Sequence, residues 1–289
     1  MRTLTKIAAT LLVAGTTSTF AHATPLQLDV YNAGPGSFHV NASVVYGETE
    51  AMVVDTGFTK ADALRIAAKV LDSGKTLKTI FISQADPDYY FGAEVLAELF
   101  PEAKVITTPA VREKIAEKMA GKLAFWGPKM GGNAPVAPVL PTAFQGHTLK
   151  IDDQQVEIRG TDGVMAHRPY LWIPSTKTLL GNVAVYGDLH LWMADAQQDQ
   201  ERQAWAQQLE AMKALKPETV VPGHMKAGTE LNGATINYSQ GYLAAFDVAK
   251  RQSDNSKALI EAMTAQYPQA ELPMALEIGA KVHMGEMKW

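Results

Sequence analysis

The sequence predicts an α/β protein in which two β-sheets pack face to face and helices cover their outer faces. The chain of 289 residues is 47% hydrophobic, which is enough apolar material for one large core. It also reads as two similar halves, each of which opens with antiparallel strands and continues with alternating strands and helices. Because helices and sheets must each bury an apolar face, two such halves favour stacked sheets with helices outside. We expect residues 24–289 to form a single domain.

The first half begins with three strand-like runs at residues 26–32, 38–47 and 50–55, which the turn signals AGPG and GETE separate. A helix is predicted over residues 59–75, with Thr59 as its N-cap and Gly74 as its stop. The apolar spacing then predicts, in order, a strand at 77–83, a helix at about 92–100, a strand at 103–109 and a helix at 110–127.

The second half also opens with antiparallel strands and continues with strands and helices. A hairpin is predicted over residues 147–160, with Asp152 and Asp153 near its turn, and apolar runs of strand length lie at 169–174 and 178–187. A helix at 199–215, a short strand at 218–223 and helical spacing from about residue 233 complete the chain. Between the halves, residues 127–141 are rich in Gly and Pro, and we expect a lid or a tether without regular structure.

Composition and charge exclude several classes of function. The net charge of −4 and a pI near 6.0 give no basic surface for nucleic acid or for an anionic membrane. The chain has no cysteine, so it has no disulfide, thiolate ligand or thiol nucleophile. We therefore expect a small molecule as the partner of this protein, with no nucleic acid and no membrane span. Its oligomeric state does not follow from the sequence.

The N-terminal residues have the pattern of an export signal. Two positive charges in MRTLTK precede the apolar run IAATLLVAG, which is too short to span a bilayer. Residues Ala21 to Ala23 then fit a small-x-small cleavage site. We predict a signal peptide over residues 1–23, cleavage after Ala23, and a periplasmic or secreted protein.

The stretch ISQADPDYYFG, residues 82–92, lies between a predicted strand and a predicted helix. Loops in this position carry chemistry more often than other parts of an α/β chain. This one holds two aspartates, two tyrosines and a glutamine, but no histidine. Asp86 and Asp88 flank Pro87, which is also ordinary turn chemistry, and residues 89–91 also fit the first turn of a helix that enters the core. Both interpretations stay open at this point.

Four stretches together carry a family resemblance. VVDTGF follows a hairpin, TIFISQADPDYYFG follows a helix, LLGNVAVYG follows a strand, and VVPGH lies near the last quarter of the chain. In this order they resemble the metallo-β-lactamase superfamily, over roughly residues 28–227. The resemblance implies a four-layer αβ/βα sandwich of hydrolases that hold one or two metal ions between the sheets.

The metal loop of this family reads Thr-His-x-His-x-Asp-His-x-x-Gly, and the chain departs from it at several positions. Gln84 and Asp86 stand where the first two histidines belong. Asp88 matches the family aspartate, and Tyr89 replaces the last histidine. Only Asp88 of this loop therefore keeps the ligand that the resemblance implies.

The other ligand positions lie in the second half of the chain. The bridging aspartate of the family corresponds to Asn182, and the histidine that closes its site corresponds to His224. One further family histidine should lie just before the strand at 169–174, where the sequence offers either Asp162 or His167. The resemblance thus implies Asp86, Asp88, Asp162 and His224 as candidate metal ligands, with Asp88 and His224 also as catalytic residues. Gln84, Tyr89, His167 and Asn182 are candidates for lining the cleft.

This donor set differs from that of a zinc enzyme. Catalytic zinc takes three protein ligands, mostly imidazole, whereas oxygen-rich sets favour harder ions. We expect at most one divalent metal ion and no standard di-zinc centre. Two function classes follow: an exported hydrolase that acts on a small ester, lactone or thioester, or a non-catalytic descendant that binds a small ligand in the former active-site cleft. Trp192 and Met193 are expected to pack in the core.

Overall fold

A computed structural model describes residues 24–289, so the predicted signal peptide over residues 1–23 lies outside the described residues. The first sheet has six strands that follow one another in chain order across the sheet. They are β1 (Gln27–Asn32), β2 (Asn41–Tyr46), β3 (Glu50–Val54), β4 (Thr76–Phe81), β5 (Lys104–Thr107) and β6 (Thr142–Ala143). β1 to β3 pair antiparallel, and β3 to β6 pair parallel through crossover helices. The carboxyl ends of β3 and β4 therefore lie at the same edge of the sheet.

The second sheet has five strands and is mostly antiparallel. Its order across the sheet is β12 (Thr219–Val220), β10 (Thr178–Leu180), β9 (Tyr170–Ile173), β8 (Gln154–Arg159) and β7 (Thr148–Ile151), and only β10 and β12 pair parallel. The hairpin β7–β8 turns at Asp152 and Asp153, which both have positive φ, as the sequence predicts. A separate parallel pair joins β11 (Tyr186–Gly187) to β13 (His224–Met225). This pair brings His224 beside Tyr186.

Alternation along the strands explains why the two sheets stack. In β3, Ala51 and Val53 pack against helices on one face, whereas Met52 and Val54 contribute to a core shared with the second sheet. In β9, Leu171 and Ile173 join that shared core, and Tyr170 and Trp172 face the helices on the other side. Each sheet is thus apolar on both faces, so both faces must be covered. This arrangement confirms the predicted four-layer sandwich.

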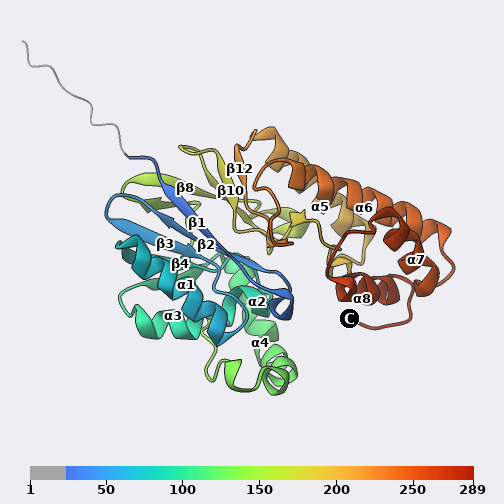
Figure 1. Ribbon diagram of the computed structural model, residues 1–289, viewed down its shortest axis with the longest axis horizontal. Helices are drawn as coiled ribbons and strands as arrows, with labels where there is room; N and C mark the ends of the chain where they lie inside the picture. The colour runs from blue at the N-terminus through green and yellow to red at the C-terminus, as the bar shows by residue number, and fades with distance from the viewer. Residues whose placement is uncertain (1–23) are drawn as a thin grey trace, which may run out of the picture.

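The helices form the outer layers, and Figure 1 shows α1 and α3 along the first sheet and α5 to α8 gathered at the opposite end of the molecule. The α-helices are α1 (Lys60–Ser73), α2 (Pro87–Tyr90), α3 (Ala93–Leu99), α4 (Pro109–Met130), α5 (Asp199–Ala214), α6 (Ala234–Gln252), α7 (Ser256–Gln266) and α8 (Pro273–His283). Short 3-10 helices lie at η1 (Pro35–Ser37), η2 (Gly131–Asn133), η3 (Gly163–Met165) and η4 (Met193–Asp195). α1 begins at Thr59, whose side chain forms a capping box with Asp62, and ends at the left-handed Gly74. Both predicted ends of α1 are confirmed.

Two segments differ from the sequence-based expectation. α4 continues to Met130, although residues 127–141 were expected to lack regular structure. Pro128 removes only one backbone hydrogen bond, near the end of the helix, where the Lys129 Nζ donates to the Phe125 carbonyl at 2.7 Å. The apolar run 178–187 is not one strand, because its chain turns at Gly181, which has φ +59 and lies against Val54. The turn carries Asn182 away from the sheet and toward the loops at its edge.

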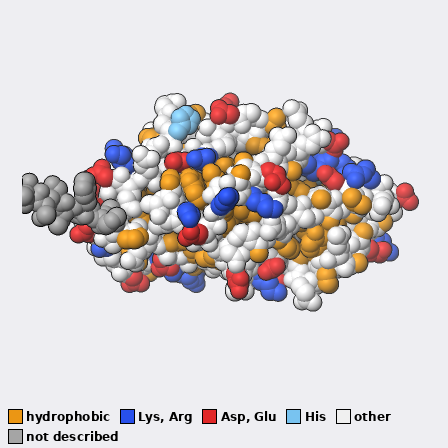
Figure 2. Space-filling model, turned by 90° about the horizontal axis from the view of Figure 1, so that it is seen from above, with side chains coloured by type: hydrophobic (Ala, Val, Ile, Leu, Met, Phe, Trp, Pro, Cys, Tyr) orange, Lys and Arg blue, Asp and Glu red, His pale blue; other side chains and the backbone are white. Residues whose placement is uncertain are grey.

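The surface agrees with the charge argument. Figure 2 shows acidic and basic side chains interspersed over the face that it presents, with apolar side chains between them. No helix within residues 24–289 has the length and apolar character needed to cross a membrane.

Candidate functional site

Asp55 fixes the start of the loop at residues 82–92. Asp55 follows β3 in a left-handed conformation, with φ +65, and its backbone N–H donates to the Phe81 carbonyl of β4 at 2.9 Å. Its carboxyl accepts two hydrogen bonds from Ser83, one from the backbone N–H and one from the hydroxyl, both at 2.7 Å. Burial raises the pKa of Asp55 to about 7, although the two bonds from Ser83 oppose the shift. The loop is thus held to the carboxyl ends of β3 and β4 by side-chain bonds.

The loop then turns into α2, whose first residue is Pro87. The Asp86 side chain makes no capping bond to the helix, and it lines a cavity instead. Tyr90 and Phe91 are buried among the apolar residues of α1 and α3, which confirms the interpretation of residues 89–91 as a helical turn that enters the core. Asp88 lies on the remaining face of α2 and is only 5% exposed. The same loop therefore both forms a helical turn and contributes to the candidate site, because Tyr90 and Phe91 pack in the core whereas Asp86 and Asp88 do not.

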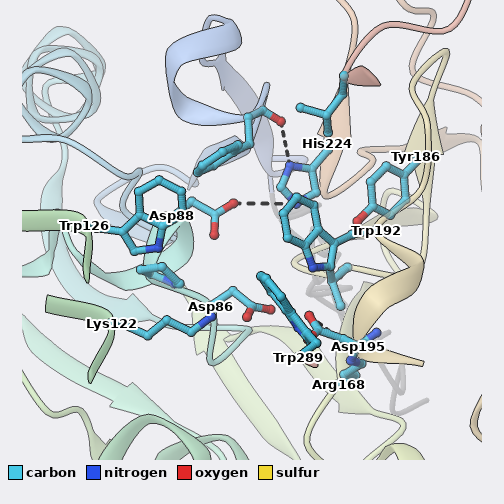
Figure 3. A pocket seen from close by; sticks show the side chains of 14 residues that line it. Asp86, Asp88, Lys122, Trp126, Arg168, Tyr186, Trp192, Asp195, His224 and Trp289 are labelled. Carbon is cyan, nitrogen blue, oxygen red and sulfur yellow. Dashed lines mark hydrogen bonds and ion pairs between the residues drawn. The ribbon is translucent and has the colours of Figure 1, made fainter. Parts of the chain in front are cut away.

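His224 lies opposite Asp88, at the end of the VVPG stretch. Its Nδ1 lies 2.9 Å from the Phe38 carbonyl oxygen, and a carbonyl only accepts, so Nδ1 carries the proton. The lone pair is then on Nε2, which lies 3.7 Å from the Asp88 Oδ2, as Figure 3 shows. Burial lowers the pKa of His224 to about 4, although the bond to Phe38 opposes the shift. At neutral pH the structure therefore presents a neutral imidazole with its acceptor nitrogen directed at Asp88.

Aromatic rings hold this imidazole in place. The Tyr186 ring stacks on it with centroids 5.1 Å apart and planes 16° apart, and the Tyr89 ring meets it edge-on at 5.5 Å. The two candidate catalytic residues thus lie face to face across a cleft, as their order in the sequence predicts, and the surrounding rings restrict how the imidazole can turn.

A cavity opens beside Asp88 and His224, and five of its 14 lining residues are Phe, Tyr or Trp (Figure 3). Its lining comes from segments that are distant in the sequence: Phe38, Asp86, Pro87, Asp88, Lys122, Trp126, Arg168, Val183, Tyr186, Trp192, Asp195, His224, Leu272 and Trp289. Sequence reasoning missed most of these residues, and it assigned Trp192 to the core together with Met193. Met193 is buried in that core, and Trp192 packs against the same core while it also lines the cavity. The aromatic residues gave no local signal, because each stands alone in its own segment.

Charged groups divide the cavity into two parts. On one side, Arg168 pairs with Asp195 at 3.5 Å, and the Trp289 Nε1 also donates to Asp195 at 2.6 Å. On the other side lie Asp86 and Asp88. Burial raises the pKa of Asp86, with a further contribution from Asp195, whereas Arg168 and Lys122 oppose the shift. Burial also raises the pKa of Asp88 well above its ordinary value, and Asp86 adds to this.

Three candidates from the sequence lie beside the cavity with their side chains bound to other parts of the chain. The Gln84 Nε2 donates to the Pro169 carbonyl at 3.0 Å, and its Oε1 is buried without a partner among residues 24–289. The Asn182 Nδ2 donates to the Val221 carbonyl at 3.0 Å, and its Oδ1 accepts from the Val185 N–H at 2.8 Å. The Tyr89 hydroxyl donates to the Asn182 carbonyl at 3.3 Å.

The two alternatives for the remaining family histidine both lie away from the cavity. Asp162 is exposed just before η3. His167 is half-buried, and burial, helped by the neighbouring Arg168, lowers its pKa to about 4. Neither residue lines the cavity, whereas Arg168, the next residue in the chain, does. The structure therefore brings together Asp86, Asp88 and His224 of the predicted metal ligands and leaves Asp162 apart.

These residues do not fit the two-metal centre that the family resemblance implies. No group of three or more His, Asp or Glu side chains that could hold a metal ion occurs within residues 24–289. Asn182 has both side-chain groups bound to the backbone, so it offers no bridging oxygen. Burial raises the pKa of Tyr89 well above its ordinary value, so this hydroxyl does not ionise to an anionic ligand near neutral pH. Three of the positions that differ from the family motif, Gln84, Tyr89 and Asn182, are instead part of the local hydrogen-bond structure.

Comparisons with known proteins agree with the fold. Residues 35–224 match the model of a family described as the metallo-beta-lactamase superfamily. No curated protein matches the chain. The structure is similar to that of a metallo-beta-lactamase family protein from Thermus thermophilus, with 14% identity, a TM-score of 0.63, and coverage of 89% of this chain and 91% of that one. It is also similar to a metallo-beta-lactamase from Pontibacter korlensis, with 16% identity, a TM-score of 0.53, and coverage of 78% and 97%. At these identities the likeness to solved structures concerns the fold alone.

Proposed function

The chain belongs to the metallo-beta-lactamase superfamily, and we propose that this member binds a small organic molecule in its aromatic cavity and does not act through a two-metal centre. The observation that supports the proposal most is the hydrogen bonding of Gln84, Tyr89 and Asn182. Each stands at a metal-ligand position of the family motif, and each directs its polar group to a backbone partner. A water nucleophile activated by two ions would need those positions as ligands.

The cavity itself supports ligand binding. Small-molecule sites are concave, mostly apolar, and carry a few polar groups that fix the orientation of the ligand. Here four aromatic walls, Phe38, Trp126, Trp192 and Trp289, surround the carboxyl groups and the His224 lone pair. The rings are held against one another, with Trp126 5.3 Å and Trp192 6.3 Å from Phe38 between ring centroids. Such a wall is pre-formed, which lowers the entropic cost of binding.

Hydrolysis with a single metal ion is the second candidate function. The observation that favours it is the pair of Asp88 and His224, which keep their family positions and lie 3.7 Å apart with the Nε2 lone pair toward the cavity. This candidate would use the same cavity for an ester, lactone or thioester.

Metal analysis separates the two candidates. Protein purified without chelator should contain less than one equivalent of any divalent metal, and it should not hydrolyse panels of esters, lactones and thioesters. A thermal-shift screen should identify small organic ligands whose effect is lost in Trp192→Leu. One equivalent of metal that is lost in both Asp88→Ala and His224→Ala, but kept in the exposed control Asp188→Ala, would favour the hydrolase. Two equivalents of zinc per chain would refute the proposal.

We also propose that the protein is exported. The support is the signal-peptide pattern of residues 1–23, which ends in the small-x-small site at Ala21 to Ala23. N-terminal sequencing of protein from the periplasmic or culture fraction should begin at Thr24. Protein in that fraction that still begins at Met1 would contradict this proposal.

A further inference from the structure

Two carboxyl groups of the cavity, Asp86 and Asp88, have no lysine or arginine within 4 Å among residues 24–289. Asp88 is 5% exposed, and among residues 24–289 it accepts no hydrogen bond from another residue. The one basic side chain within 4 Å of it in this part of the chain is His224, at 3.7 Å, and that imidazole is neutral at neutral pH. The Asp86 side chain lines the same cavity. Among residues 24–289 it makes neither a capping bond nor an ion pair within 4 Å. Burial disfavours the ionised form of both carboxyl groups, because a buried charge without a close partner is costly, and a cation bound beside them would favour that form. Lys122 acts on both carboxyl groups and Arg168 on Asp86, each from more than 4 Å away, so a cation bound beside the pair would complement it.

The positive side chains of the cavity offset the two carboxyl groups only in part. Arg168 faces Asp195 at 3.5 Å, and Asp195 also accepts from Trp289. The Lys122 Nζ lies 5.5 Å from the centroid of the Trp289 ring, on the far side of the cavity from His224 in Figure 3. With Arg168 and Asp195 cancelling, two carboxyl groups face one lysine, so a ligand that brings positive charge complements the cavity better than a neutral or anionic one.

The aromatic rings favour the same kind of ligand. Trp126, Phe38, Trp192 and Trp289 form a continuous arc, in which successive ring centroids lie 5.3, 6.3 and 5.5 Å apart. Lysines already lie at both ends of this arc, since the Lys129 Nζ is 5.6 Å from the Trp126 centroid and Lys122 is beside Trp289. The faces of indole rings attract cations through the ring quadrupole. Between the two ends, where Asp86 and Asp88 lie, the chain places no lysine or arginine within 4 Å of either carboxyl group among the described residues.

We propose that the ligand of this cavity is a small organic ammonium ion, held between the aromatic arc and the carboxyl groups of Asp86 and Asp88. This inference rests on the proposed ligand-binding function and specifies its ligand class. A metal cation is a poorer match, because divalent ions need several oxygen or nitrogen ligands and the described residues supply no group of three. An organic ammonium ion is weakly hydrated and can exchange water for ring faces at small cost.

Calorimetric titration with choline and with its neutral carbon isostere, 3,3-dimethyl-1-butanol, tests the charge directly. Both probes have the same bulk, and only choline is charged. We expect choline to bind at least about tenfold more tightly, since a buried charge pair contributes more than shape alone. Equal affinity for both probes would overturn the ammonium inference and leave the ligand-binding function intact. If neither probe binds, the ammonium inference fails, whereas the ligand-binding function is decided by the metal analysis and the ligand screen described above.

Matched variants test the residues. Asp88→Asn keeps the shape of the side chain and should weaken choline binding by about tenfold or more, whereas Asp188→Asn, outside the cavity, should leave it unchanged. Asp86→Asn serves the same purpose if Asp88→Asn does not fold. Trp126→Leu should weaken choline binding by roughly three- to thirtyfold, and Phe125→Leu, the exposed neighbour, should not. Binding of Zn²⁺ or Mg²⁺ in place of choline, unaffected by Trp126→Leu, would overturn the inference.

Discussion

Replacing Asp55 by asparagine should change how the stability of the protein depends on pH. Asp55 is 2% exposed and holds the loop at residues 82–92 through two bonds from Ser83. In Asp55→Asn the amide oxygen can still accept from the Ser83 N–H, and the amide nitrogen can donate to the Ser83 hydroxyl. The substitution therefore removes the titration of the carboxyl group while it keeps the hydrogen bonds.

The magnitude follows from the pKa of Asp55, which burial raises from 3.8 to about 7 in the folded protein. Between these pH values the folded protein keeps a proton that the unfolded chain has released, so stability is lost as pH rises through this range. Each pKa unit corresponds to about 1.36 kcal/mol, so a pKa difference of about 3 between the folded and unfolded states changes the free energy of unfolding by roughly 4 kcal/mol. This contribution is complete below about pH 4 and is lost above about pH 7. Asp55→Asn has no carboxyl group at this position, so its stability lacks this pH-dependent contribution.

Urea denaturation at several pH values between 4 and 8 measures the effect. The stability of Asp55→Asn relative to the wild type should rise by about 4 kcal/mol from pH 4 to pH 7, with similar m-values. Other titrating groups are present in both proteins and cancel in the difference. Asp188→Asn, an exposed position, serves as the matched control. A difference between Asp55→Asn and the wild type that stays constant within about 1 kcal/mol over this range would refute the argument.

Three further predictions concern the stability of the protein. Gly223→Ala should destabilise the protein by about 3 kcal/mol in chemical denaturation, because the added Cβ would lie 2.1 Å from the Asn182 carbonyl oxygen; Gly34→Ala, with open space around it, should stay within about 1 kcal/mol of the wild type. Arg202→Met should cost about 3 kcal/mol, since the buried guanidinium bonds Asp247 and two backbone carbonyls, and a loss below about 1 kcal/mol would contradict this. Incubation with EDTA should leave the midpoint of thermal unfolding unchanged, and a fall of more than about 5 °C would indicate a structural metal ion.

The sequence predicts the fold and the centre of the site because both depend on local patterns. Strand and helix periodicity, with the caps of Thr59 and Gly74, define the elements. Asp88 lies in α2, soon after β4 ends, and His224 begins β13, soon after β12 ends. A residue that follows a strand lies at the edge of a sheet, so two such residues in stacked sheets meet. This reasoning needs no knowledge of side-chain contacts.

The walls of the cavity are beyond such reasoning. Trp126 comes from the last turns of α4, which continues past the point where Gly and Pro suggested that it ends. Trp192 and Trp289 follow β11 and α8, and their rings meet only in the folded chain, with centroids 5.5 Å apart. An isolated tryptophan in an apolar segment has the same local pattern whether it packs in the core or faces a cavity. The sequence left Asp162 and His167 open as alternatives for a similar reason, and in the structure Arg168 lines the cavity whereas neither of them does.

The residues at the altered ligand positions hold together the segments that a metal centre would otherwise join. Asn182 joins the turn after β10 to Val221 after β12, and Tyr89 joins α2 to Asn182. Asn41, which is not at a ligand position, adds a bond from its Nδ2 to the Pro222 carbonyl at 2.8 Å. Buried amide and hydroxyl groups of this kind specify one arrangement of loops when their partners are present, and they are costly when the partners are absent. A single reversion such as Asn182→Asp would therefore place a carboxylate against the Val221 carbonyl without restoring the missing histidines. The altered motif works as a unit: it maintains the geometry of the cleft, and it leaves Asp86, Asp88 and His224 free to contact a ligand.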